Sequence, residues 1–117
     1  MPSSLPDSAD CPVDFDHLKR MTLGEEALER EVLRMFLKQT GRLLDALACS
    51  PAEARTRTLT HTLKGSAKAI GAFRLADRAA ALEEMVRNGG DLRAPLAALE
   101  AAVAEARGAI DARLGRS

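Results

Sequence analysis

Apolar side chains recur every three or four residues through most of this chain, and no segment shows the strict alternation of a strand. The repeat is interrupted at a few turn-forming sites, of which Asn88-Gly89-Gly90 is the strongest. Ala occurs 22 times, and no long β-branched or aromatic run is present. Because Ala is the best helix former, composition and periodicity agree. Together they predict an all-α protein.

The interruptions divide the chain into a flexible tail at 1–12, one helical domain at 13–114 and a flexible end at 115–117. A short helix is expected at 14–21, and a long one between Gly24 and Pro51, with Thr22 and Glu25 as a capping box. Three more long helices follow at about 51–70, 72–87 and 91–114, the first capped by Ser50 and the last by Asp91. Four long amphipathic helices with short loops predict an antiparallel up-down-up-down four-helix bundle, with the short helix at one end or side.

Each helix carries one apolar stripe that we expect to face the core. The stripes are Leu28, Val32, Met35, Phe36, Leu43 and Leu47 in the second helix, Leu59, Leu63 and Ile70 in the third, Ala72, Leu75, Ala79, Leu82 and Val86 in the fourth, and Leu92, Leu96, Leu99, Val103, Ala106 and Ile110 in the fifth.

Composition disfavours several functions. Lys plus Arg and Asp plus Glu both number 17, and the only aromatic residues apart from histidine are three Phe, so the basic field and stacking rings of a nucleic-acid binder are missing. No apolar run is long enough for a membrane span, and the first residues do not resemble a signal peptide. Cys11 and Cys49 form no motif, which is typical of reduced thiols in a cytoplasmic protein.

Met1 and the short tail favour a free-standing protein.

His61 does not lie on the apolar stripe of its predicted helix. With Leu59 set at zero and about 100° per residue, Leu63 and Ile70 lie near 40° and 20°, whereas His61 lies near 200°. We therefore expect the imidazole to face solvent. Arg57, Lys64 and Lys68 share that outer half of the helix.

Gly65 lies one turn beyond His61, although a glycine in mid-helix costs about 1 kcal/mol relative to Ala. Its missing side chain would open one side of the ring to a partner, and Lys64 would bring an ammonium group near. An open imidazole beside a cation suits a phosphoryl group held on the ring nitrogen. Each feature alone is commoner as a solvated or packing residue, so both interpretations stay open on these residues. His17 lacks this context and is interpreted as a solvated residue.

Other chemistries find no support in the sequence. No His, Cys or carboxylate lies three or four positions from His61, so a local metal pair is not expected. No serine or cysteine stands in a nucleophile-elbow context, and no phosphate-binding glycine-rich loop occurs. The chain is therefore not expected to be a kinase.

The segment His61-Thr-Leu-Lys64-Gly65-Ser66-Ala-Lys-Ala-Ile-Gly71-Ala72 resembles the signature of histidine-containing phosphotransfer (HPt) domains of two-component phosphorelays. Residues 21–36 also resemble the entry to the second helix of this family, and the resemblance covers about residues 13–113. It implies a monomeric bundle that takes a phosphoryl group from a receiver-domain aspartate and passes it to another. His61 would be the phosphoacceptor, Lys64 would neutralise phosphate charge, and Gly65 would give the receiver access. Mg²⁺ would be bound by the receiver, and no cofactor by this chain.

The geometry of the helical hairpin about Gly71 and Ala72 predicts a role for Glu83. His61 precedes this turn by about as many residues as Glu83 follows it, so the two residues should lie at the same height along the axes of the paired helices. Glu83 could accept a hydrogen bond from Nδ1–H of His61 and leave Nε2 as the nucleophile. The alternative is an ion pair of Glu83 with Arg87, one turn on. Lys68, which is often small or an amide in HPt relatives, and Arg87 are possible supporting cations.

The sequence thus predicts a cytoplasmic, monomeric phosphorelay intermediate without a nucleotide site. The alternative is a helical adaptor that is not phosphorylated and binds partner proteins through exposed apolar residues such as Phe15, Leu18 and Leu28. The dimerisation domain of a histidine kinase fits less well, because its histidine is typically followed by an acidic residue. Here Thr62 follows, and the chain has enough helices for a bundle of its own.

Overall fold

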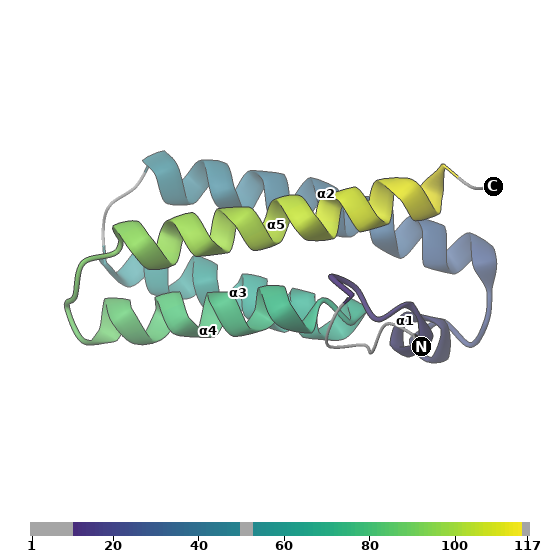
Figure 1. Cartoon of the computed structure of the whole chain (residues 1–117), viewed down its shortest axis with the longest axis horizontal. Helices are drawn as coiled ribbons and strands as arrows, with labels where there is room; N and C mark the ends of the chain where they lie inside the picture. The colour runs from purple at the N-terminus through teal and green to yellow at the C-terminus, as the bar shows by residue number, and fades with distance from the viewer. Residues whose placement is uncertain (1–10, 50–52, 116–117) are drawn as a thin grey trace, which may run out of the picture.

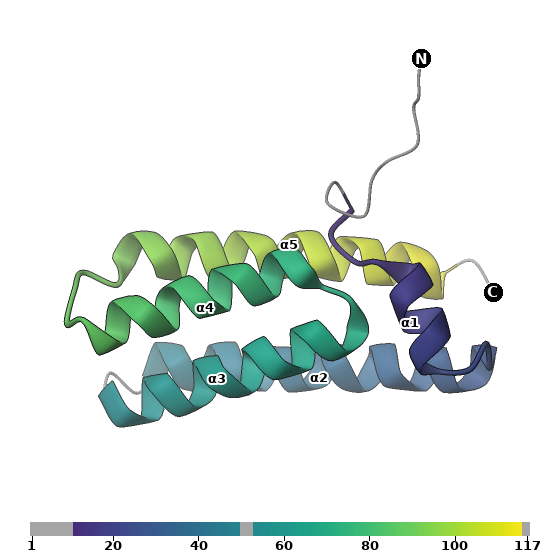
Figure 2. The ribbon, with the colours of Figure 1, turned by 90° about the horizontal axis from the view of Figure 1, so that it is seen from below.

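The computed structural model describes residues 11–49 and 53–115, and over these residues the chain is helical and contains no strand. The helices are α1 (Phe15–Met21), α2 (Glu26–Cys49), α3 (Glu53–Ile70), α4 (Phe73–Arg87) and α5 (Arg93–Leu114). The predicted all-α class is confirmed. Figures 1 and 2 show the four longer helices side by side, with α1 at one end. The predicted terminal segments 1–12 and 115–117 and the Ser50 cap lie mostly or wholly outside the described residues.

One apolar core runs along the inside of this helical bundle. Every helix contributes side chains that are 4% exposed or less, among them Leu18, Leu33, Phe36, Leu63, Ile70, Leu75, Leu82, Leu99 and Ile110. No helix among the described residues is long and apolar enough to cross a membrane.

The buried face of α2 differs from the predicted stripe. Leu28 and Met35 are 41% and 62% exposed, whereas Leu33 is fully buried, and Glu29 and Thr40 share its face. The prediction that Leu28 and Met35 are core residues was wrong. The buried face of α2 includes two polar residues, Glu29 and Thr40, which a search for the spacing of apolar residues leaves out.

Leu18 and His17 of α1 are also more buried than expected. Leu18 is only 1% exposed, so it is a core residue and not part of an exposed apolar face. His17 is half-buried, and its Nε2 is buried with no hydrogen-bond partner among the described residues. Its ring meets Phe73 edge-on at 5.2 Å between centroids. The packing of α1 onto the bundle therefore corrects both expectations.

The predicted caps of α2 and α5 are wrong in detail. Thr22 is the C-cap of α1, and its hydroxyl donates to the Leu18 carbonyl at 2.9 Å instead of capping α2. Helix α5 begins at Arg93 with Leu92 as its N-cap. The Asp91 carboxylate still accepts from the Arg93 backbone N–H at 3.0 Å. Its pKa lies below the usual value because the Arg93 side chain and backbone both donate to it.

The α3–α4 turn determines which part of α3 lies beside which part of α4. Gly71 has φ = +90°, a conformation that residues with a Cβ rarely adopt, and Ala72 N–H donates back to the Ala67 carbonyl at 2.8 Å. Helices α3 and α4 then lie side by side (Figure 2). The turn thus places the middle of α3 beside the middle of α4.

Candidate functional site

His61 lies on the outer face of α3, as its angular position predicted, and its side chain is 70% exposed. Its Nδ1 is 3.2 Å from Oε2 of Glu83 on α4. The equal height of the two residues about the Gly71 turn is therefore confirmed. Glu83 does not pair with Arg87, which instead donates to Glu84 at 3.2 Å.

Glu83 also accepts from a second residue. Its Oε1 lies 2.7 Å from Nζ of Lys64, and its side chain is 13% exposed. The hydrogen bond from Lys64 holds the pKa of the Glu83 carboxyl below its usual value, with a smaller contribution from His61, and these effects outweigh its partial burial. Glu83 is therefore ionised at neutral pH, and a carboxylate at this position favours the imidazole tautomer with its proton on Nδ1. Nε2 is then the unprotonated nitrogen.

Lys64 is more constrained than the sequence indicated. Its side chain is only 23% exposed, and its ammonium group is bound by Glu83. Sequence reasoning considered Lys64 and Glu83 separately and missed this ion pair. The spacing that aligned His61 with Glu83 could have revealed it, because Lys64 lies one turn after His61 on the same helix.

Gly65 lies in helical backbone with open space beside it. Among the described residues, a Cβ added there would meet no atom within 4 Å outside its own helix backbone and chain neighbours. Packing against these residues therefore does not require a glycine at this position.

The contacts of Glu83 with His61 and Lys64 lie within a part of the chain that matches a known family. A model of the Hpt domain family matches residues 31–113, well over half of the chain. The chain belongs to the Hpt domain family. Such domains are histidine phosphotransfer intermediates of phosphorelays, and they interact with receiver domains and kinases. No curated protein and no solved structure matches the chain.

Beside His61, this Hpt domain has a shallow hollow of about 480 Å³, which we call the His61 hollow. It is lined by Ala54, Arg57, Thr58, His61, Thr62 and Glu83. Lys68 and Arg87, the expected supporting cations, do not line it. Arg57 does line it, although its position in the sequence indicated only that it shares the outer half of the helix.

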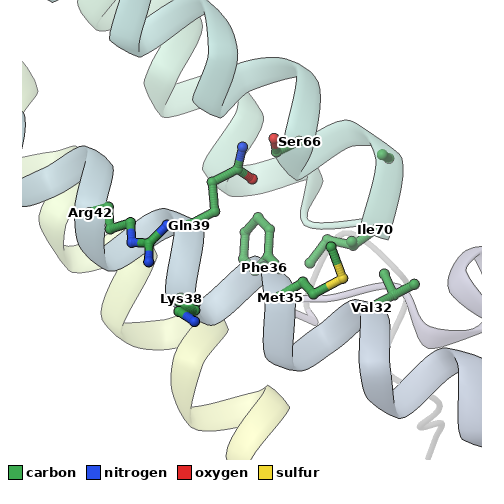
Figure 3. Close-up of a pocket in the computed structure, with 9 residues that line it drawn as sticks. Val32, Met35, Phe36, Lys38, Gln39, Arg42, Ser66 and Ile70 are labelled. Atoms are coloured by element: carbon green, nitrogen blue, oxygen red, sulfur yellow. The ribbon is translucent and has the colours of Figure 1, made fainter.

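A second depression, the α2–α3 groove, lies between those helices and has a volume of about 520 Å³. Figure 3 shows Phe36 and Ile70 at its floor with Met35 and Val32 beside them. Lys38, Gln39, Arg42, Ser66 and Ala69 complete its lining. The exposed Met35 thus belongs to a mixed apolar and basic surface on the Hpt domain, next to the helix that carries His61.

The described residues contain no group of three or more His, Cys, Asp or Glu side chains that could hold a metal ion. Cys11 is half-buried and Cys49 is exposed, and both are free thiols.

Proposed function

We propose that this chain is a phosphorelay intermediate that accepts a phosphoryl group on Nε2 of His61. The donor is the phosphorylated aspartate of a receiver domain, or a kinase, and the acceptor is the aspartate of another receiver. The single observation that supports this role most is the 3.2 Å contact between Nδ1 of His61 and the Glu83 carboxylate on an otherwise exposed ring.

In the transfer step, the lone pair of Nε2 attacks the phosphorus of the aspartyl phosphate. The N–P bond forms, the P–O bond to the aspartate breaks, and the aspartate leaves as a carboxylate. The ring then carries positive charge and keeps its proton on Nδ1, where the Glu83 carboxylate stabilises it. The return step reverses these bonds on the second receiver. Mg²⁺ on the receiver would stabilise the transferring phosphoryl group.

The receiver would cover more than the imidazole. A standard interface takes about 800 Å² from each partner, equivalent to a disc with a radius of roughly 16 Å. Ser66 of the α2–α3 groove is five residues after His61, about 7.5 Å along the helix axis and about 140° around it. A receiver of this size centred on His61 would reach around the outer face of α3 to this groove. In this proposal the scaffold is an antiparallel up-down-up-down bundle that acts as a cytoplasmic monomer.

The α2–α3 groove also fits the alternative, a non-phosphorylated adaptor. The face first expected for that role loses support, because Leu18 is buried and the Phe15 ring is covered by the Arg113 guanidinium at 4.8 Å. The groove could still bind a protein partner. Partner binding alone does not separate the two functions, whereas phosphorylation of His61 does.

The test is incubation of the purified chain with a panel of receiver domains phosphorylated with labelled phosphate. We expect label to appear on the chain and to be lost in acid, as for phosphohistidine. His61→Gln should keep its helical circular dichroism and take no label, whereas His17→Gln, checked for folding in the same way, should still be labelled. Acid-stable label, or label that persists in His61→Gln, would contradict the proposal.

A further inference from the structure

We propose that Arg57, rather than Lys64, is the cation that pairs with the phosphoryl group on His61. This inference rests on the proposed phosphoacceptor role of His61 and assigns its electrostatic partner. It concerns contacts within this chain and is independent of which receiver donates the group.

The lining of the His61 hollow favours Arg57. Arg57 and Thr58 lie one turn before His61 on α3 and line the same hollow as its ring, whereas neither Lys64 nor Lys68 lines it.

Lys64 already forms an ion pair with Glu83. Its Nζ is 2.7 Å from Oε1, and both side chains are largely buried. If Lys64 moved to a phosphoryl group, it would leave the Glu83 carboxylate without its main counter-charge in a site that is only 13% exposed. Removing one member of a largely buried pair is costly. Lys64 thus fixes Glu83, and Glu83 fixes the ring.

The other candidate cations are further away or occupied. Lys68 is seven residues after His61, about 10.5 Å along the helix axis. Arg87 donates to Glu84. Arg57, by contrast, is exposed, and within the part of the chain whose side chains are described its guanidinium has no hydrogen bond or ion pair.

Arginine also suits the ligand better than the hydroxyls nearby. Its planar guanidinium can donate two parallel hydrogen bonds to phosphoryl oxygens, which only accept. The Thr58 hydroxyl already donates to the Ala54 carbonyl at 3.1 Å. Placed four residues before His61, Arg57 has its Cβ about 5–6 Å from that of the histidine, and its long side chain can reach the group on Nε2.

The test uses phosphoramidate, a small phosphoryl donor that needs no receiver. We expect Arg57→Ala to slow phosphorylation of His61, or to shorten the lifetime of the phosphohistidine, by about three- to tenfold, the size of one charge-assisted contact at a partly exposed site. In ³¹P NMR, the pKa of the phosphoryl group should rise in Arg57→Ala, because a nearby cation is lost. Arg57→Lys should restore part of both effects.

Arg55→Ala is the matched control. Arg55 is an exposed arginine two residues earlier on α3, and its substitution should change neither readout. If Arg57→Ala behaves like Arg55→Ala in both readouts, Arg57 does not pair with the phosphoryl group and the inference is overturned. If the wild-type chain takes no phosphoryl group from phosphoramidate or from any receiver, the proposed function itself fails, and this inference fails with it.

Discussion

At the scale of single residues, Glu83 connects the two charged groups of the site. One carboxylate oxygen faces Nδ1 of His61, and the other is bound by Lys64. The second contact keeps Glu83 ionised, since it lowers the carboxyl pKa, and the ionised form is the better acceptor for Nδ1–H. The imidazole is therefore oriented by a carboxylate that is itself held in place.

Substitution of Glu83 should change the tautomer of His61. In Glu83→Ala the ring loses its acceptor, so ¹⁵N NMR should show a mixture of the two neutral tautomers where the wild type favours the Nδ1–H form, and phosphotransfer should slow. Glu83→Gln should keep part of the rate, because an amide oxygen still accepts. Glu84→Gln, which alters an exposed neighbour, is the control and should leave the tautomer unchanged. The same tautomer in all three variants and the wild type would mean that Glu83 does not orient the ring.

The sequence predicted this contact only in part. Residue counting about Gly71 placed His61 and Glu83 at one height because two helices of equal pitch were assumed. It did not separate the roles of Arg57 and Lys64, since both lie on the outer half of α3 and helical angles do not show which of them contacts a residue of α4. The spacing put Lys64 one turn from His61 and so near Glu83, but their ion pair also depends on the distance between α3 and α4.

At the scale of elements, the helices themselves were predictable and their buried faces less so. On α3, Thr60 is fully buried, and its hydroxyl donates to the Thr56 carbonyl at 2.9 Å. A threonine that satisfies its hydroxyl on its own helix can occupy the core, which an apolar stripe does not reveal. On α2 an apolar stripe likewise does not reveal Glu29, which pairs with Arg113 of α5, or Thr40, whose buried hydroxyl has no hydrogen-bond partner among the described residues.

Gly71 and Gly65, both in the sequence that resembles the HPt signature, should respond in opposite ways to alanine. At Gly71 a Cβ would lie 2.6 Å from the Asp14 carbonyl oxygen, and φ is +90°. Gly71→Ala should therefore destabilise the fold by roughly 1–3 kcal/mol in urea unfolding. Gly65→Ala should stabilise it by up to about 1 kcal/mol, since the residue is helical with open space beside it. A Gly71→Ala variant as stable as the wild type would show that the α3–α4 turn tolerates a Cβ.

At the scale of the whole molecule, contacts of charged side chains join α5 to α1 and α2 at one end of the bundle. Arg113 of α5 donates to Glu29 of α2 at 2.9 Å, and its guanidinium lies over the ring of Phe15 in α1. Arg30 donates to the Leu114 carbonyl at 2.9 Å. The hydrogen bond that Arg113 donates to Glu29 raises the pKa of Arg113. Of these residues, Phe15, Glu29 and Arg30 precede the part of the chain that matches the Hpt domain family, and Leu114 follows it.

Glu29→Gln tests whether this end of the bundle contributes to global stability. The Glu29 side chain is 7% exposed, so loss of its charge leaves Arg113 with a weaker acceptor in a partly desolvated site, and unfolding should become easier by about 1–3 kcal/mol. Glu31→Gln, an exposed carboxylate two residues on, should change stability by less than about 0.5 kcal/mol. Because Glu29 belongs to neither the His61–Glu83 contact nor the His61 hollow, phosphorylation of His61 at a temperature where the variant is folded should keep its wild-type rate. A slower rate in folded Glu29→Gln would show instead that this end of the bundle is coupled to the site on α3.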